Sequence, residues 1–417
     1  MLVETVFFII GAVIFIGFFA QLFFEKTKVP DVLILIFTGI ILGASLDIFD
    51  PALFMKVAPF VGGFAIIIIL FDGGINLNLY RVATEVSEAA EFTFIMFLLT
   101  TTAVGGIMHF LFSWNFMSGL LLGAAVGGTS SAVVLTTIKK VSAKEKVKTL
   151  LSLESAITDA LCIVVAMLII QGMTTTAPTA QEALHSVLSA FSIAVVVAFV
   201  FGVFWMGILQ KFYGKPFGYL LTMAFAFVLY SAVEYSKANG AISVFVFGLV
   251  LGNSAQIAKI LKMPGGFVIS NTMKSFQTEV TFFVKTFFFV YLGMIFDPAG
   301  VTRDVAIIVT GILILIFAAR YLATKVLKHS HPEFEKYGTL ITTMMPRGLA
   351  AAVLASLPIS AGMQLPLFSE IVILVVIGTN VITTIGVFYH EKRCIKSEED
   401  TELVAPPDEK SKDVADS

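Results

Sequence analysis

Two carboxylates stand inside an apolar stretch that is long enough to cross a bilayer. The stretch runs from Leu150 to Ile170, LLSLESAITDALCIVVAMLII, and it carries Glu154 and Asp159 in its first half. A charged side chain at membrane depth costs roughly 2.5–3.5 kcal/mol on insertion scales, so acids that are kept there are expected to serve a function. One carboxylate can hold either a proton or a monovalent cation. We therefore predict that Asp159 carries these ions across the membrane, one at a time.

Side-chain oxygens near Asp159 complete a predicted cation site. Residues four apart share a face of a helix, so Ser155 and Asp159 can hold one ion together. Glu154 and Thr158 form a second stripe, about 100° round the same helix. Oxygen ligands with a single carboxylate suit Na⁺, K⁺ or Li⁺ better than a divalent ion, which usually needs more charge. The predicted cation site consists of Asp159, Ser155, Glu154 and Thr129, with Thr158 adjacent.

The alternative role for these acids is to hold helices together through ion pairs. Three bases and three acids are embedded in the apolar parts of the predicted helices, away from their ends: Arg320, Arg347 and Lys285, and Asp72, Glu154 and Asp159. If Asp72 and Glu154 are each paired with a base, Asp159 is the least neutralised acid. Lys285 can be structural, or it can pair with Asp159 until a cation displaces it. Ser131 is expected to serve close helix packing, as small residues often do in membranes.

The composition is that of a membrane protein. Of the 417 residues, 58% are hydrophobic and only 13% are charged, about half the usual charged fraction of ~25% in soluble domains. The net charge of −2 argues against a nucleic-acid partner. Two cysteines, Cys162 and Cys394, provide neither a disulfide framework nor a metal site. The first apolar run lacks a basic leader and is long enough to span, so we expect a retained helix.

Thirteen apolar segments of spanning length predict an all-α polytopic fold. They lie near 2–24, 31–46, 57–76, 92–112, 116–137, 147–170, 183–209, 217–235, 240–253, 279–296, 304–324, 338–358 and 367–388. Residues 1–390 then form one transmembrane domain, and the polar residues 391–417 a disordered tail. Most Lys and Arg residues in the loops follow odd-numbered helices, which places the N-terminus outside and the tail in the cytoplasm.

The fifth and twelfth predicted helices are interrupted. Gly127-Gly128-Thr129-Ser130-Ser131 stands in the fifth, and Met345-Pro346-Arg347-Gly348 in the twelfth. Irregular backbone at membrane depth is tolerated where it lines a cavity or is buried in protein. The two breaks are seven helices apart, so the two copies would run in opposite directions, as in the inverted repeats of secondary transporters. We therefore predict a midplane binding site between the breaks.

Several of these motifs, in this order, resemble those of monovalent cation/proton antiporters of the NhaP-like branch. The motifs are KVPDVLILIFTGIILG, LFDGG, GGTSSAVV, SLESAITDALCIV, FFFVYLGM and PRGLAAAV. The resemblance implies a homodimer in which helices 4–6 and 11–13 form an ion-carrying core. Helices 1–3 and 8–10 would form the dimer scaffold, against which the core moves like an elevator. It also implies that Asp159 carries the ion, and that Arg320 and Arg347 pair with acids of the core.

Thr158 departs from the pattern of the family it resembles. The electroneutral branch typically has Asn before the ion-carrying aspartate, and the electrogenic branch a second Asp. Because Thr158 is uncharged, we expect one proton per cation and no net charge moved. Na⁺ or Li⁺ is the expected cation, with K⁺/H⁺ exchange on the same fold as the alternative.

Two other classes of function agree less well with the sequence than exchange does. A passive cation channel would need a continuous row of ligands, and buried arginines near one site argue against it. An intramembrane hydrolase would need a catalytic motif, and the chain contains neither HExxH nor GxSxG. We expect a transporter without a cofactor rather than an enzyme, in a plasma membrane, with the lipid bilayer and its transported ions as partners.

Overall fold

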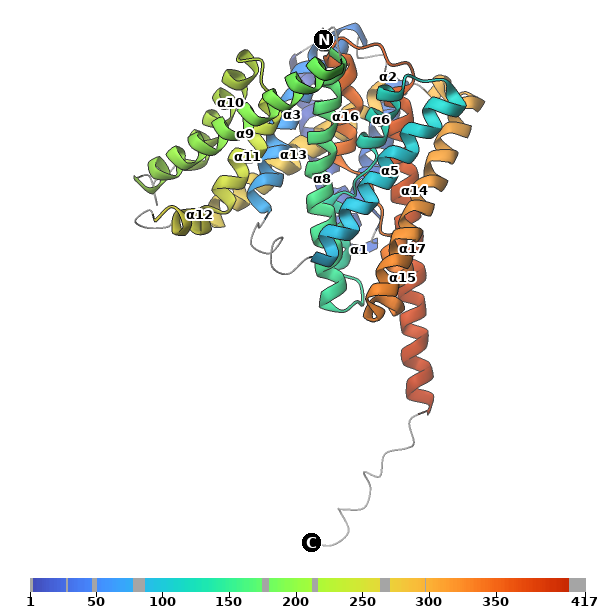
Figure 1. The fold of residues 1–417 in the computed structure, drawn as a ribbon. Helices are drawn as coiled ribbons and strands as arrows, with labels where there is room; N and C mark the ends of the chain where they lie inside the picture. The colour runs from blue at the N-terminus through green and yellow to red at the C-terminus, as the bar shows by residue number, and fades with distance from the viewer. Residues whose placement is uncertain are drawn as a thin grey trace.

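The structure is a computed structural model that describes residues 3–27, 29–46, 51–77, 87–174, 180–211, 217–262, 271–296 and 298–404. Within these ranges the chain is helical throughout, apart from connections and breaks (Figure 1). The first half contains α1 (Val3–Thr27), α2 (Asp31–Leu46), α3 (Pro51–Asn76), α5 (Ser87–Phe112), α6 (Phe116–Ala125), α7 (Ser131–Ile138), α8 (Glu145–Thr174) and α9 (Ala180–Lys211). The second half contains α10 (Gly218–Tyr235), α11 (Gly240–Gly252), α12 (Ser254–Ile260), α13 (Asn271–Ile295), α14 (Arg303–Ser330), α15 (Gly338–Thr343), α16 (Leu349–Ser360) and α17 (Phe368–Val404). Two short 3₁₀ helices, η1 (Pro298–Gly300) and η2 (Pro332–Tyr337), flank α14.

The described helices have the length and apolar surface of membrane spans, which confirms the predicted all-α polytopic fold. Eight of them are long and apolar enough to cross a membrane, or nine if α11 and α12, which bend by 78°, count as one span. Large apolar side chains point outward, such as Phe8 at 76% and Phe110 at 81% exposure. An outer surface with many exposed Phe side chains is typical of a protein whose surroundings are apolar. The exact number of thirteen spans stays a prediction.

The helices interrupted in the sequence are interrupted in the structure, at the expected places. Residues 126–130 separate α6 from α7, and residues 344–348 separate α15 from α16; we call them the first and the second break. The backbone N–H of Ser130 donates to the carbonyl of Pro346 at 2.7 Å, so the two breaks meet. Gly348 is required at this crossing because a Cβ atom there would collide with the side chain of Ser130.

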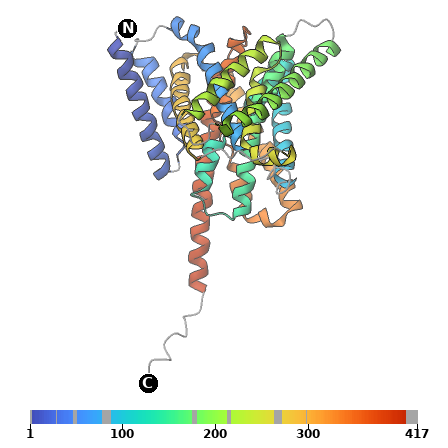
Figure 2. The ribbon, with the colours of Figure 1, turned by 90° about the vertical axis from the view of Figure 1, so that its left-hand side faces the viewer.

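Close helix pairs hold the bundle together. Near the first break, α5 packs on α6, α8 and α14. Elsewhere, α3 packs on α11 and α2 packs on α13. A Cβ atom on Gly39 of α2 would lie 2.8 Å from the Cα of Gly293 of α13, so both glycines permit backbone contact. Figure 2 shows α1 and α2 at one edge of the bundle, beside α13.

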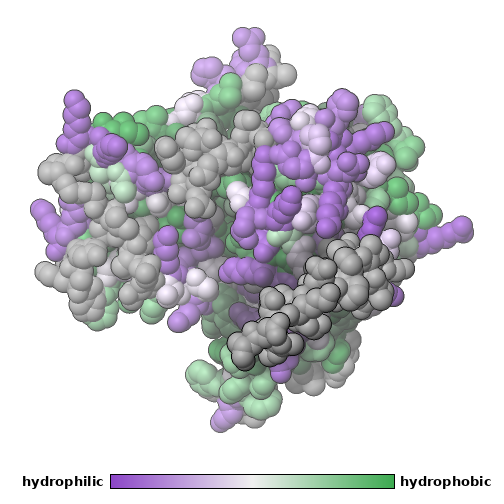
Figure 3. Space-filling view, turned by 90° about the horizontal axis from the view of Figure 1, so that it is seen from below, coloured by the Kyte–Doolittle hydropathy of each residue, from purple (hydrophilic) through white to green (hydrophobic). Residues whose placement is uncertain are grey.

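The predicted tail is partly helical. α17 continues to Val404 and projects beyond the rest of the bundle (Figures 1 and 2). Residues 391–404 therefore extend the last helix, a correction of the disordered tail predicted from residue 391, and residues 405–417 lie outside the described ranges. A polar sequence can remain helical when a preceding helix has already met the cost of nucleation. Viewed from the end at which α17 projects, hydrophilic residues cover much of the face (Figure 3).

Candidate functional site

Asp159 is held by the first residue of the helix that follows the first break. Its Oδ2 accepts from the backbone N–H of Ser131 at 2.8 Å and from the hydroxyl of Ser131 at 2.5 Å. The first N–H groups of a helix have no partner within the helix and favour a negative charge. The break thus creates a donor for Asp159 that an unbroken helix would not provide. Ser131 was expected to serve packing only, so this contact is a correction.

Asp159 lines a cavity of about 570 Å³, which we call the Asp159 cavity. α8 forms one wall, with Lys148, Ser152 and Asp159, and α3 forms another, with Asp72 and Asn76. Lys148 lies near the start of α8, where it pairs with the exposed Glu145 at 3.4 Å. Asp159 is partly exposed within the cavity. A hydrated ion in this space can therefore reach its carboxylate.

Asp72 is a second acid that lines this cavity. The ion pair predicted for it is not found among the described residues. Its Oδ1 accepts from the side-chain amide of Asn76 at 3.1 Å, and within the described part of the chain no Lys or Arg pairs with it. The reason is local: α3 ends one turn after Asp72, and its own last residue supplies the donor. Two carboxylates from two helices thus face one water-accessible space.

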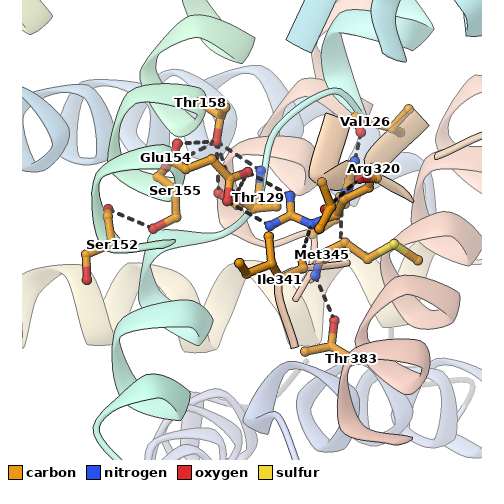
Figure 4. Close-up of polar contacts among 12 residues, drawn as sticks. Val126, Thr129, Ser152, Glu154, Ser155, Thr158, Arg320, Ile341, Met345 and Thr383 are labelled. Carbon is orange, nitrogen blue, oxygen red and sulfur yellow. Dashed lines mark hydrogen bonds and ion pairs between the residues drawn. The ribbon is translucent and has the colours of Figure 1, made fainter. Parts of the chain in front are cut away.

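Glu154 lies in a different environment, although it belongs to the same helix. Both of its carboxylate oxygens accept from the guanidinium of Arg320, each at 2.8 Å. The hydroxyl of Thr129 donates to the same carboxylate at 3.0 Å. Glu154 and Arg320 are 1% and 0% exposed. A bidentate pair of this kind leaves neither charge available to a mobile ion. Figure 4 shows this pair beside the first break.

Thr158 closes the first break rather than facing an ion. Its hydroxyl oxygen accepts from the backbone N–H of Thr129 at 3.1 Å, and the hydroxyl lies 2.9 Å from the carbonyl of Glu154. A buried hydroxyl can act both as acceptor and as donor in this way. Thr158 is therefore fully occupied by backbone groups (Figure 4).

Ser155 and Thr129, both predicted cation ligands, direct their hydroxyls away from Asp159. Ser155 donates to the carbonyl of Ser152 at 3.0 Å and is fully buried (Figure 4). Thr129 donates to Glu154, as described above. Helical spacing placed Ser155 on the face of Asp159, but a serine in a helix can bond its hydroxyl to a carbonyl of the preceding turn instead. The hydroxyl that contacts Asp159 is that of Ser131.

Among the described residues no acid pairs with Arg347, which corrects the prediction for it. Its Nε donates to the carbonyl of Val126 at 2.8 Å, and its Nη1 donates to the carbonyl of Met345 at 2.7 Å. Both carbonyls belong to the breaks, where no helical N–H is available to them. The guanidinium of Arg347 thus binds backbone carbonyls where the two breaks meet, and the residue is fully buried there.

Lys285 pairs with Asp31, an acid that was not considered for it. The Nζ of Lys285 on α13 lies 2.5 Å from Oδ2 of Asp31, the first residue of α2. The Asp31 side chain is 3% exposed. Asp31 is the first residue of the helix predicted over residues 31–46. Because this pair joins α2 to α13, Lys285 does not contact Asp159 or Asp72 in this structure.

The chain is similar to known proteins over most of its length. Residues 11–389 match the sequence profile of the family "Sodium/hydrogen exchanger, transmembrane". The K⁺/H⁺ antiporter NhaP2 of Shewanella oneidensis is 25% identical over 398 residues, which are 90% of this chain and 66% of that protein. The K⁺/H⁺ antiporter NhaP of Alkalimonas amylolytica is 22% identical over 365 residues, 85% of this chain and 60% of that protein. The chain thus spans about two thirds or less of the length of these two relatives.

The chain is also similar to proteins that are named as Na⁺/H⁺ antiporters, by sequence in one comparison and by fold in another. Na⁺/H⁺ antiporter 1 of Methanocaldococcus jannaschii is 26% identical over 157 residues, 37% of each chain. The solved structure of the sodium proton antiporter MjNhaP1 from the same organism, at pH 8, has a TM-score of 0.73 with this chain at 20% identity. That likeness covers 97% of this chain and all of the solved one, and it shows a shared fold. Because the family profile covers most of its length, this chain belongs to the sodium/hydrogen exchanger family, whose members are multi-pass membrane transporters.

Proposed function

We propose that this chain exchanges a monovalent cation for a proton across the membrane, one for one, through competition at Asp159. The observation that carries the proposal is the contrast within α8. Asp159 is bonded by the neutral donors of Ser131 and borders a cavity, whereas Glu154 is neutralised by Arg320. A carboxylate without a fixed counter-charge can exchange its partner for another cation.

Asp159 is the one group at the site that exchanges its partner during the proposed cycle. This supports electroneutral exchange. Arg320 and Glu154 keep a net charge of zero between them, and Thr158 is uncharged. Asp159 is then neutral with either guest, a proton or a cation. Asp72, across the cavity, adds negative potential that concentrates cations near Asp159.

The proposed arrangement in the membrane follows the expected core and scaffold. The core comprises α5–α8 and α14–α17, and the scaffold comprises α1–α3 and α10–α13. The Asp159 cavity has a wall in each part, because α8 belongs to the core and α3 to the scaffold. Movement of the core against the scaffold would expose Asp159 to alternate sides. We place the N-terminus outside and the cavity mouth at Lys148 toward the cytoplasm of a plasma membrane, in a homodimer.

There are two candidates for the transported cation: Na⁺ or Li⁺ on the one hand, and K⁺ on the other. Na⁺ or Li⁺ suits a small oxygen-lined site. K⁺ is favoured by a specific observation: the relatives that align with 85–90% of this chain are named as K⁺/H⁺ antiporters.

The proposal is tested in proteoliposomes with an imposed pH gradient and a pH-sensitive dye. Addition of Na⁺, K⁺ or Li⁺ at several pH values should release the dye signal at rates that rank the three cations. Electroneutral exchange should proceed at an unchanged rate when the membrane voltage is clamped at different values. Flux that requires a voltage shunt would indicate a channel and contradict the proposal.

A further inference from the structure

Side chains of α17 bind the backbone of the second break. The hydroxyl of Thr379 accepts a hydrogen bond from the backbone N–H of Arg347 at 3.2 Å. The hydroxyl of Thr383 accepts from the backbone N–H of Met345 at the same distance (Figure 4). The side-chain amide of Asn380 donates to the carbonyl of Arg347 at 2.7 Å. All three side chains are buried, and together they bind backbone groups where the helical hydrogen-bond pattern is interrupted.

One peptide unit, Pro346–Arg347, connects Thr379 to the first break. Its N–H, which belongs to Arg347, donates to Thr379. Its carbonyl, which belongs to Pro346, accepts from the backbone N–H of Ser130 at 2.7 Å. Because a trans peptide unit is planar, its N–H and its carbonyl point in opposite directions. The contact with Thr379 therefore orients the carbonyl that binds Ser130.

Ser130 in turn fixes the start of the helix that binds Asp159. It lies directly before α7, and its carbonyl accepts from the backbone N–H of Val134 at 2.9 Å. The next backbone N–H along the chain is that of Ser131, which donates to Asp159 at 2.8 Å. Hydrogen bonds on both sides of Ser130, one to the second break and one within α7, thus determine the direction of the donor at Ser131.

The first break contains the same kind of contact, made by the helix that carries Asp159. The hydroxyl of Thr158 accepts from the backbone N–H of Thr129 at 3.1 Å, as the hydroxyl of Thr379 does in the second break. The residue after Thr158 is Asp159, whereas the residue after Thr379 is Asn380. α17 therefore repeats the threonine contact of α8 but has a neutral amide in place of the ion-binding acid. The role that remains for Thr379 is to hold the backbone.

We propose that Thr379 is a positioning residue for ion exchange at Asp159, an inference that rests on the function proposed above. By orienting the carbonyl of Pro346, it keeps Ser130 in place and aims the backbone N–H of Ser131 at the carboxylate. Thr379 is fully buried and is not among the described residues that line the Asp159 cavity, so it acts on the ion only through the two breaks. A protonated carboxyl accepts hydrogen bonds less strongly than a carboxylate, whereas a bound cation leaves the carboxylate charged. A misdirected donor therefore favours the proton over the cation.

Thr379→Val tests the proposal, because valine has nearly the shape of threonine but cannot accept from the N–H of Arg347. Thr379→Ser retains the hydroxyl and should restore the wild-type behaviour. The matched control is Thr383→Val, which removes a buried hydroxyl from the same helix. Within the described residues, the N–H that Thr383 binds, that of Met345, belongs to a peptide unit that makes no hydrogen bond to the first break. Thr379→Ala, which leaves room for a water at the N–H of Arg347, replaces Thr379→Val if that variant does not fold.

Exchange is measured in proteoliposomes over a range of pH, with Na⁺ and K⁺ as the added cations. Thr379→Val should raise the KM for the cation about threefold at a pH where proton and cation compete, because a hydrogen bond is weakened rather than removed. The difference should become smaller at higher pH, and kcat should be unchanged. The wild type, Thr379→Ser and Thr383→Val should share one KM at each pH. Equal KM values for Thr379→Val and Thr383→Val at every pH would overturn the proposal, since Thr379 would then have a structural role only.

Hydrogen–deuterium exchange of peptides that cover residues 126–138 provides a readout that does not depend on transport. Deuterium uptake there should be faster in Thr379→Val than in the wild type and in Thr383→Val, because the bond from Ser130 to Pro346 is loosened. Unchanged protection of this segment in Thr379→Val would overturn the proposal. A wild type that does not exchange ions would contradict the function proposed at Asp159, whereas these failures in a wild type that exchanges ions would contradict only the role of Thr379.

Discussion

Glu154 and Asp159 are acids of one helix, five residues apart, and their surroundings are opposite. Glu154 is buried against a guanidinium that binds both of its oxygens. Asp159 receives two hydrogen bonds from Ser131 and borders a cavity. Both acids are stabilised within the protein, but only Glu154 is stabilised by a fixed charge. The comparison teaches that the type of donor, rather than depth alone, decides which acid is available to an ion.

The two environments also differ in what they lose when an acid is neutralised. Removal of one partner of a buried ion pair leaves an uncompensated charge, which costs about 3–5 kcal/mol. Loss of a charge that is held by neutral donors beside water leaves only hydrogen-bonding groups, which water can satisfy. Glu154 should therefore matter most for stability, and Asp159 for exchange.

The largest effect on exchange is expected from Asp159→Asn. Asparagine has nearly the same shape and can still accept from the backbone N–H of Ser131, but it cannot be charged. Dye-based exchange in proteoliposomes should fall to the level of protein-free vesicles, with an unchanged melting temperature. Residual exchange well above that level would show that another group carries the ions.

The largest effect on stability is expected from breaking the Glu154–Arg320 pair. Glu154→Gln or Arg320→Gln should each destabilise the protein by about 3–5 kcal/mol, because the remaining charge is buried without a partner. The double variant should recover part of this loss, since no charge is left unpaired. Thermal unfolding in detergent measures the effect, and additive losses in the double variant would contradict direct coupling.

The exposed Lys146–Glu333 pair is the matched control for that experiment, with N and O atoms 2.6 Å apart. The hydrogen bond from Lys146 lowers the pKa of Glu333. A carboxylate whose pKa is lowered in the folded state contributes stability that is fully present above its unfolded pKa and is lost as the pH falls through its folded pKa. Because both side chains are exposed and screened by solvent, Lys146→Gln should leave the melting temperature unchanged at neutral pH.

A moderate effect on cation affinity is expected from Ser131→Ala. The substitution removes the hydroxyl donor to Asp159 but keeps the backbone N–H. A typical hydrogen bond contributes about 1 kcal/mol, so the KM for the cation should rise roughly fivefold. Thr136→Ala on the same helix is the control, because its hydroxyl bonds only to preceding carbonyls of α7. Equal KM values in Ser131→Ala and the control would argue that Ser131 does not stabilise the ion-binding carboxylate.

The smallest effect is expected from Lys148→Gln, because Lys148 lies at the mouth of the Asp159 cavity, far from the carboxylate of Asp159 along α8. A positive charge there opposes entry of a cation, and its neutralisation should lower KM about twofold to threefold at low ionic strength. Interactions of this size are of order 1 kcal/mol or less in water and are screened by salt. Lys144→Gln, which changes an exposed lysine outside the cavity lining, is the control. An effect that is independent of salt would contradict an electrostatic origin.

Much of this arrangement could be predicted from local sequence patterns. Apolar segments of spanning length define the helices, and Gly127-Gly128 and Pro346 mark the breaks because neither residue type favours a helix interior. The special position of Asp159 could also be inferred, since an acid inside an apolar helix needs a reason. These features depend on residues that are near one another in the chain.

The remaining features depend on contacts between distant helices. Lys285 and Asp31 are 254 residues apart, and helical periodicity does not specify which side chains meet across such a distance. Helical spacing favoured Ser155 as the partner of Asp159, but the start of α7 turns Ser131 toward it instead. A balance of charges predicts an acid as the partner of Arg347, but carbonyls at a break that lack a helical N–H partner also accept its hydrogen bonds.

The central claim is that a proton and a cation exclude one another at Asp159. It is tested most directly by the number of protons that purified protein releases when Na⁺ or K⁺ is added, measured in weakly buffered detergent solution across a range of pH. We predict nearly one proton per bound cation at low pH, where Asp159 is protonated, a decline toward zero at high pH, and no release from Asp159→Asn. Cation binding to the wild type without proton release at any pH would contradict the account.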